Sequence, residues 1–186
     1  MQMKQWYVMH IKEGMERQAT ELIRRTVPSD LWSHCRILKK EKLFRGEGKL
    51  LLSCEKMFPG YLFIETEWPE ELMDYLERSR EYPHFVKDEE ENLIAINAQD
   101  LGFLKSVCGE KLDKSMSLSE VETDEEGNLT HISGVLEKYS GQIVKKRLRK
   151  RYVLAQVDLF QRKEAVLFGI YLAGDEIIQT SLKYIN

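Results

Sequence analysis

The chemistry most plainly encoded in this sequence is phosphate binding by a short basic run. Residues 145–151 hold six cations and no acid. Six like charges on one tight turn repel one another, and a merely solvated surface is expected to intersperse acids among them. Cations that neutralise several phosphates release counterions, which gives a salt-dependent attraction to RNA or DNA. The run therefore predicts nucleic-acid contact, with a solvated basic turn as the alternative. The residues concerned are Lys145, Lys146, Arg147, Arg149, Lys150 and Arg151.

A second group of residues is aromatic. The stretch 57–64 reads Met-Phe-Pro-Gly-Tyr-Leu-Phe-Ile, and its second half has the aromatic and β-branched character of a strand. In a strand, alternate side chains share a face, so Tyr61 and Phe63 lie on one face and Leu62 and Ile64 on the other. One face must be covered by helices. The aromatic face is either ordinary core packing or an apolar groove for a partner.

The residue pattern for catalysis is missing. The four histidines are scattered without metal-ligand spacing, and the chain has no G-x-S-x-G elbow, no Gly-rich phosphate loop and no G-x-G-x-x-G fingerprint. Three cysteines without a CxxC pair encode neither a disulfide framework nor a zinc site. We expect no enzymatic activity, no metal, no cofactor, and reduced structural thiols. The residues examined are His10, His34, His84, His131, Cys35, Cys54 and Cys108.

Charge divides the chain into three segments. The net charge of -3 is the balance of a mildly acidic segment 1–108, a strongly acidic segment 109–131 and a basic segment 132–186. The middle segment is poor in large apolar side chains, which is typical of a solvated connector. We therefore predict two small domains joined by an acidic linker; a long surface loop within one domain is the alternative. The sequence also lacks an apolar membrane span and a signal peptide, so we expect a cytoplasmic protein without a membrane contact.

Periodicity predicts an α+β fold. In segment 1–108, Met15, Ala19, Leu22 and Ile23 fall on one helical face, and Pro28 ends that helix. Strands are expected at 6–11, 61–64, around Phe85 and at 93–96, a hairpin at 36–52, and further helices after Pro69 and after the capping residue Asn97. This order predicts helices flanking a mainly antiparallel sheet. Segment 132–186 shows short alternating runs, including 153–159 and 164–168, which predict a small SH3-like β-barrel.

These motifs resemble the NusG family of transcription factors. Trp6-Tyr7-Val8, Gly14-Met15-Glu16, the stretch 57–64 and His84-Phe85-Val86 are similar to its N-terminal NGN domain, and 134–143 is similar to its C-terminal KOW motif. The resemblance covers nearly the whole chain in the family's domain order. Val135 replaces the usual KOW proline, and the basic run occupies a barrel turn. These departures resemble the specialised paralogues, RfaH and LoaP, with LoaP the more similar.

The resemblance implies a bacterial elongation factor that binds RNA polymerase at its clamp region and promotes processive antitermination. It implies that a coiled-coil tip of the polymerase binds an apolar groove formed by His10, Phe58, Tyr61, Phe63 and Phe85. It favours nascent hairpin RNA as the ligand of the basic barrel, and non-template DNA as a ligand of the hairpin cations Lys39, Lys40, Lys42 and Arg45. A charged edge ribbon is the plain reading of that hairpin. A monomer is expected, with a ribosomal protein or Rho as further partners. The alternative function is a ribosome- or RNA-binding module acting in translation.

Overall fold

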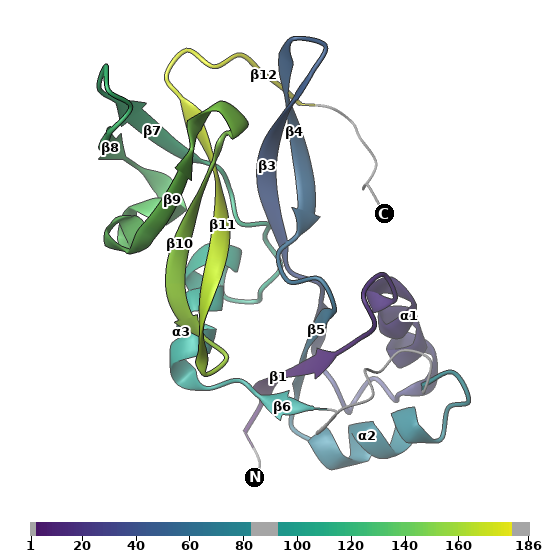
Figure 1. The fold of residues 1–186 in the computed structure, drawn as a ribbon. Helices are drawn as coiled ribbons and strands as arrows, with labels where there is room; N and C mark the ends of the chain where they lie inside the picture. The colour runs from purple at the N-terminus through teal and green to yellow at the C-terminus, as the bar shows by residue number, and fades with distance from the viewer. Residues whose placement is uncertain (1–2, 83–92, 180–186) are drawn as a thin grey trace.

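The computed structural model describes residues 3–82 and 93–179, drawn in Figure 1. It is a mixed fold of α-helices and mainly antiparallel sheets. The helices are α1 (Glu16–Thr26), α2 (Pro69–Glu77) and α3 (Ala98–Cys108). The predicted helical face of α1 is confirmed, because Ala19, Leu22 and Ile23 are buried.

The first sheet has four antiparallel strands in the order β2-β5-β1-β6. Its two faces bury different residues. Leu62 and Ile64 pack with α1 and α2 in one hydrophobic core, whereas Phe63 and Val8 point to the opposite face and join a second, larger core. The predicted alternation along 61–64 is therefore confirmed. The strands are β1 (Gln5–His10), β2 (His34–Arg36), β5 (Tyr61–Thr66) and β6 (Ile94–Ala95). The strand expected around Phe85 lies outside the described residues.

The second sheet is curled and forms the barrel-like part of the molecule, in the order β8-β7-β11-β10-β9. Its longest pairing is the β10–β11 hairpin, and the predicted alternation at 153–159 is confirmed by the buried residues of β10. The strands are β7 (Ser119–Thr123), β8 (Leu129–Ile132), β9 (Ile143–Arg147), β10 (Tyr152–Leu159) and β11 (Arg162–Leu172). The strand expected at 164–168 is thus longer at both ends. The residues between Ser133-Gly134 and Ser140-Gly141 were expected to form a short extended run, and this is wrong, because Gly134–Gln142 is a 3-10 helix.

The acidic segment 109–131 contains structure that its composition does not predict. It contains β7 and all but the last residue of β8, and β7 pairs in parallel with β11. Ser119 and Val121 are wholly buried, and the Ser119 hydroxyl accepts a hydrogen bond from the Leu136 amide at 3.0 Å. The segment is therefore part of the curled sheet and not only a connector. The division of the chain into domains at residues 108 and 132 stays a prediction.

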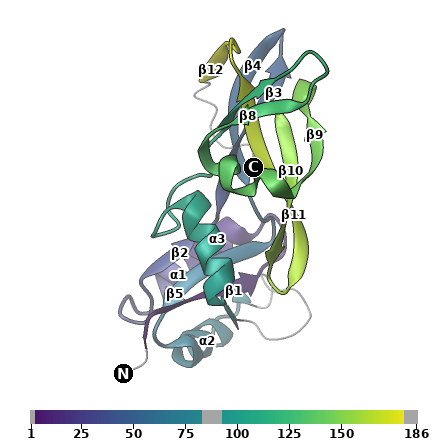
Figure 2. The same cartoon turned by 90° about the vertical axis from the view of Figure 1, so that its left-hand side faces the viewer.

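A long hairpin connects the two sheets in space. It consists of β3 (Lys39–Gly46) and β4 (Lys49–Lys56), and β12 (Ile177–Gln179) pairs in parallel with β4. Figures 1 and 2 show it standing beside β11. The close approach requires Gly169 of β11, because a Cβ there would lie 2.4 Å from the carbonyl oxygen of Glu41.

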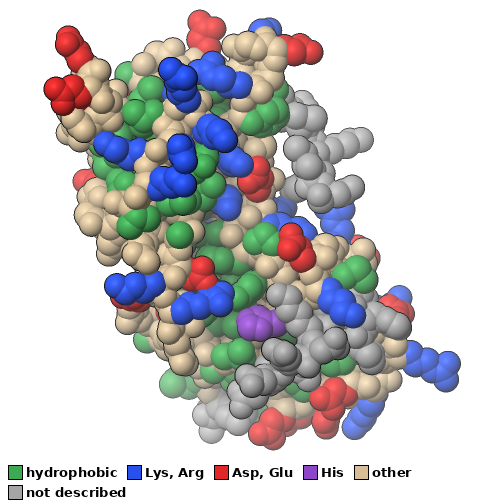
Figure 3. Space-filling view, in the orientation of Figure 1, with side chains coloured by type: hydrophobic (Ala, Val, Ile, Leu, Met, Phe, Trp, Pro, Cys, Tyr) green, Lys and Arg blue, Asp and Glu red, His purple; other side chains and the backbone are tan. Residues whose placement is uncertain are grey.

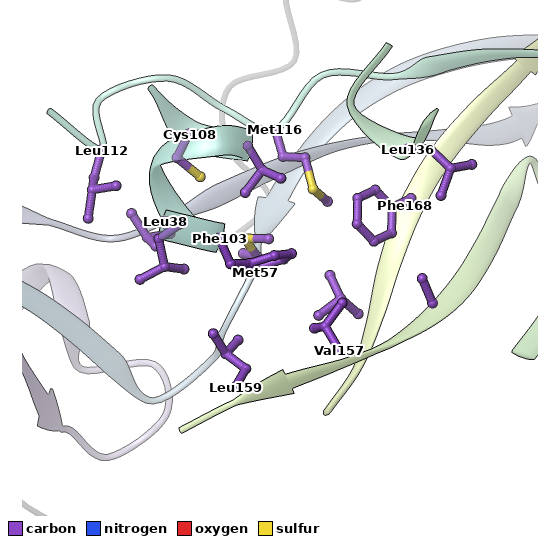
Figure 4. Close-up of a cluster of buried hydrophobic side chains, with 14 of the residues drawn as sticks. Leu38, Met57, Phe103, Cys108, Leu112, Met116, Leu136, Val157, Leu159 and Phe168 are labelled. Atoms are coloured by element: carbon purple, nitrogen blue, oxygen red, sulfur yellow. The ribbon is translucent and has the colours of Figure 1, made fainter. Parts of the chain in front are cut away.

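The larger core continues from the first sheet to the second. Four side chains of this core are labelled in Figure 4: Phe103 of α3, Met57, which follows β4, and Val157 and Phe168 of β10 and β11. Helix α3 begins as predicted, since the Asn97 side chain accepts a hydrogen bond from the Asp100 amide at 2.8 Å. This shared core holds the β10–β11 hairpin against the first sheet.

Candidate functional site

The predicted groove residues on the first sheet do lie together. His10 of β1 meets Tyr61 of β5 edge-on, with ring centroids 4.7 Å apart. Phe58 and Phe63 lie 6.1 Å apart, and Phe63 stacks on Tyr61 at 6.5 Å. We call His10, Phe58, Tyr61 and Phe63 the aromatic cluster. Phe63 has no exposed surface, whereas the other three are half-buried, so they form its accessible part.

A buried carboxylate positions the turn that carries Phe58. Glu16, at the start of α1, accepts a hydrogen bond from the Gly60 amide at 2.8 Å and pairs with the Lys56 amine at 2.6 Å. Burial acts to raise the pKa of Glu16, but the hydrogen bonds from Lys56 and Gly60 outweigh it and hold the pKa below its usual value. Gly60 has φ +81°, which glycine adopts without strain. These contacts tie the aromatic turn rigidly to α1.

The aromatic cluster is covered by the chain's own β10–β11 turn. The Phe160 ring lies 5.6 Å from Phe58 and from Tyr61, and 6.2 Å from Phe63. Figure 1 shows this hairpin reaching from the curled sheet to β1 and β6. A cavity of about 240 Å³ remains beside it, lined by residues that include His10, Tyr61 and Phe160. The structure therefore places an internal occupant on the predicted groove.

Two polar contacts hold the turn in this position. The Arg162 guanidinium donates a hydrogen bond to the Tyr61 hydroxyl at 3.0 Å, and the Phe160 amide donates to Asp100 at 2.9 Å. Asp100 is the same residue that completes the cap of α3. Phe160 and Gln161 have φ values of 54° and 60°, which bulky side chains rarely adopt. The strained turn is thus maintained by its contacts with β5 of the first sheet and with α3.

Most of the basic run is exposed, but its side chains point in different directions. Cross-strand register places Lys145 opposite Leu154 and Arg147 opposite Tyr152, on the outer face of the curled sheet. Lys146 is opposite the buried Val153 and reaches the Gly127 carbonyl at 3.4 Å on the other side. Arg149 and Lys150 are exposed on the short 3-10 turn 148–150. We call Lys145, Arg147, Arg149 and Lys150 the cationic face.

Arg151, the last cation of the run, is nearly buried. Its Nε donates to Asp175 Oδ2 at 2.6 Å, and a further guanidinium nitrogen donates to Asp175 Oδ1 at 2.5 Å. Burial acts to raise the pKa of Asp175, but the bonds from Arg151 and the Leu172 amide lower it. The guanidinium is therefore engaged within the protein and closes the turn between β9 and β10.

The hairpin cations predicted to bind DNA separate into two pairs. Lys39 and Lys40 are half-buried at the base of the hairpin, and burial lowers the pKa of the Lys40 amine. Lys42 pairs with Glu55 at 3.2 Å, and Arg45 is exposed near the hairpin tip. The structure brings Lys42 and Arg45, but not the other pair, next to Arg149 and Lys150.

Comparison with known proteins decides the family. The profile described as "Transcription termination factor nusG" matches residues 4–104, which is more than half of the chain. The chain belongs to the NusG family. Its fold is similar to that in the structure titled "Domain interaction in Thermotoga maritima NusG", with a TM-score of 0.51, 20% identity, and coverage of 90% of this chain and 94% of that one. No curated protein matches in a sequence search.

Membership of the NusG family identifies the chain as a transcription factor whose relatives bind RNA polymerase. None of the helices in the described part of the chain is long and apolar enough to cross a bilayer.

The predicted groove residue Phe85 lies outside the described residues. Within residues 3–82 and 93–179, no group of His, Cys, Asp and Glu is arranged to hold a metal ion.

Sequence reasoning missed the residues that cover the aromatic cluster. The turn at Phe160 and Gln161 joins two alternating runs without the Asn-Gly or Asp-Gly pair that such turns prefer. A phenylalanine in a two-residue turn is itself informative. Its positive φ costs backbone strain that glycine would avoid, so its ring is expected to make contacts that offset the strain. Arg162 gave no local signal, since its contact with Tyr61 is formed only in the folded chain.

Proposed function

We propose that this NusG-family protein binds RNA polymerase through its aromatic cluster and keeps the polymerase in a processive state. The observation that carries this proposal is the ring cluster on β1, β5 and the turn before β5, formed by His10, Phe58 and Tyr61 around the buried Phe63. Helices of a partner bind such apolar surfaces through a few anchoring side chains. Binding that favours one polymerase conformation disfavours pausing and termination and needs no active site.

The position of Phe160 adds a condition to this function. Its ring occupies the surface that a polymerase helix would contact. The similar Thermotoga maritima structure is titled for an interaction between domains. We infer that the arrangement in which Phe160 covers the aromatic cluster, which we call closed, competes with polymerase, because the Phe160 ring lies on the same rings. Binding then requires the β10–β11 hairpin to move away. The apparent Kd for polymerase equals the Kd of the open molecule divided by the fraction of molecules that are open.

We further propose that the protein is a specialised antiterminator of the LoaP type whose cationic face binds a structured RNA in the transcript. The four side chains are exposed, three of them on or beside the tight turn 147–151. Long cationic side chains there suit the phosphates and 2′-hydroxyls of A-form RNA, with little reading of base sequence. Specificity then comes from the shape of the RNA hairpin.

The test of the polymerase proposal is a termination assay with purified polymerase and the Tyr61→Asp variant. Tyr61 is half-buried, so a carboxylate there keeps contact with solvent, whereas the same change at Phe63 would bury a charge in the core. We expect wild-type protein to increase read-through and Tyr61→Asp to lose both read-through and binding. The matched control is Tyr75→Asp, an exposed tyrosine on α2. Equal polymerase binding by the two variants, or wild-type protein found only in ribosomal fractions, would overturn the proposal.

A further inference from the structure

The two basic elements of the chain meet in a single groove that neither forms alone. One wall comes from the β3–β4 hairpin, and the other from the turn 148–150 with β10 and β11. The groove has a volume of about 390 Å³, within the range of roughly 300–1,000 Å³ typical of sites for small organic molecules. We call it the composite groove. It is lined by Lys42, Leu43, Phe44, Arg45, Leu50, Arg149, Lys150, Tyr152 and Leu167.

The lining of the composite groove is cationic on both walls and contains no carboxylate. Lys42 pairs with Glu55, but within the described residues no ion pair engages Arg45, Arg149 or Lys150. Arg45 contributes to lowering the pKa of Asp175, but Asp175 is already paired with Arg151 through two hydrogen bonds. The groove therefore presents uncompensated positive charge, which suits a phosphate-bearing ligand.

The groove also offers aromatic surface between its cations. Phe44 and Tyr152, one from each wall, are both half-buried and leave part of their rings accessible. Leu50 and Leu167 add apolar surface. Figure 3 shows this face of the molecule, where Lys and Arg side chains gather over the curled sheet and β3 with hydrophobic side chains between them. Cations interleaved with aromatic rings are the features by which proteins bind single-stranded nucleic acid.

The composite groove is continuous with the cationic face. Arg147 is opposite Tyr152, and Lys145 is opposite Leu154, which itself pairs with Leu167. Side chains at directly opposed positions share a face of the sheet. The cationic face and the groove therefore adjoin at Tyr152, so an RNA strand that leaves a helix on the cationic face has a direct path into the groove.

We propose that the composite groove holds an unpaired nucleotide of RNA next to a paired segment bound by the cationic face. The base stacks on Phe44 and Tyr152, while Arg45, Arg149 and Lys150 bind the flanking phosphates. This inference rests on the proposed RNA-binding function and specifies its ligand as a hairpin with a single-stranded tail. Base stacking tolerates any base, so the groove reads the presence of an unpaired nucleotide and not its identity.

The test measures binding of the full chain to a labelled RNA hairpin, with and without a tail of about five nucleotides, by fluorescence anisotropy. Phe44→Leu keeps apolar volume in the hairpin but removes the ring. We expect it to weaken binding of the tailed RNA about tenfold, the effect of losing one stacked base, and to leave the blunt hairpin unchanged. Arg45→Ala, at an exposed position, gives the same pattern if folding of the Phe44 variant is in question.

Two further variants separate this inference from the function on which it rests. Arg149→Ala with Lys150→Ala should weaken both RNAs and lower the salt slope by about two. Lys146→Ala, a cation on the opposite side of β9, should change neither. If Phe44→Leu and Arg45→Ala bind tailed RNA like the wild type while the double variant is impaired, the groove proposal is wrong and RNA binding stands. An unimpaired double variant would overturn RNA binding itself. Tighter binding of the tailed hairpin made of DNA would exclude RNA as the occupant.

Discussion

Removal of the Phe160 ring should free the aromatic cluster and increase affinity for polymerase. In the closed arrangement this ring contacts three others, at centroid distances of 5.6, 5.6 and 6.2 Å. Each aromatic pair contributes roughly 0.5–1.5 kcal/mol beyond the area that it buries. Phe160→Ala in a fully buried site would cost about 3–5 kcal/mol. Because Phe160 is only half-buried, we take about 2 kcal/mol as the loss of closed-state stability.

A loss of about 2 kcal/mol changes the ratio of closed to open molecules by roughly 30-fold. If the closed arrangement predominates, the apparent Kd for core RNA polymerase should fall by up to the same factor. The measurement is a titration of labelled protein with core polymerase. Gln161→Asn is the matched control, because it lies in the same turn, makes no ring contact, and asparagine tolerates a positive φ.

The wild type and Gln161→Asn should differ by less than about twofold, since the ring contacts persist in both. Phe160→Ala with an affinity equal to or below that of the wild type would show that the ring does not compete with polymerase. A folded Tyr61→Asp variant that gains affinity would refute the location of the binding surface.

Three more outcomes test the packing around these sites. Glu16→Gln should lose about 1–3 kcal/mol of unfolding free energy at pH 7, because the buried carboxylate accepts bonds from Lys56 and a backbone amide. Since the folded pKa of Glu16 lies below its usual 4.5, this difference should be complete above pH 4.5 and shrink as pH falls through the folded pKa in acid titrations. At pH 8 a thiol reagent should modify only Cys54 quickly, because burial raises the pKa of the other two thiols to about 12; fast reaction of all three would contradict their burial. Gly169→Ala should destabilise the fold by roughly 1–3 kcal/mol in denaturant melts, since the new Cβ would collide with the Glu41 carbonyl; wild-type stability would show that β3 moves away freely.

Sequence patterns predicted the elements whose signals are local. The helical face of α1, the Asn97 cap of α3 and the alternation of β10 all depend on residues close together in the chain, and the structure confirms each. The membership of Tyr61 and Phe63 in one ring cluster followed from strand alternation alone. These features could be predicted because neighbouring side chains determine them.

Features that depend on distant partners were not predictable. β7 lies in an acidic segment, and the side chain that it buries at Ser119 is polar and becomes satisfied only by the Leu136 amide. The burial of Arg151 requires Asp175, from which it is separated along the chain by β10 and β11. The cover that Phe160 provides depends on three rings more than ninety residues earlier in the chain. In each case the decisive contact joins segments that composition and periodicity treat separately.

The parallel pairing of β12 with β4 has a consequence for the biogenesis of the protein. Ile177, Ile178 and Gln179 pair with Leu50, Leu51 and Leu52, so the outer edge of β4 obtains its partner only after the segment 53–176 has been synthesised. Until then the nascent chain carries an unpaired edge strand that contains three consecutive leucines. Such edges recruit strands from other molecules, and pairings between distant segments form slowly. The time that the ribosome takes to deliver β12 therefore sets the shortest period for which this edge of each new molecule is exposed to aggregation.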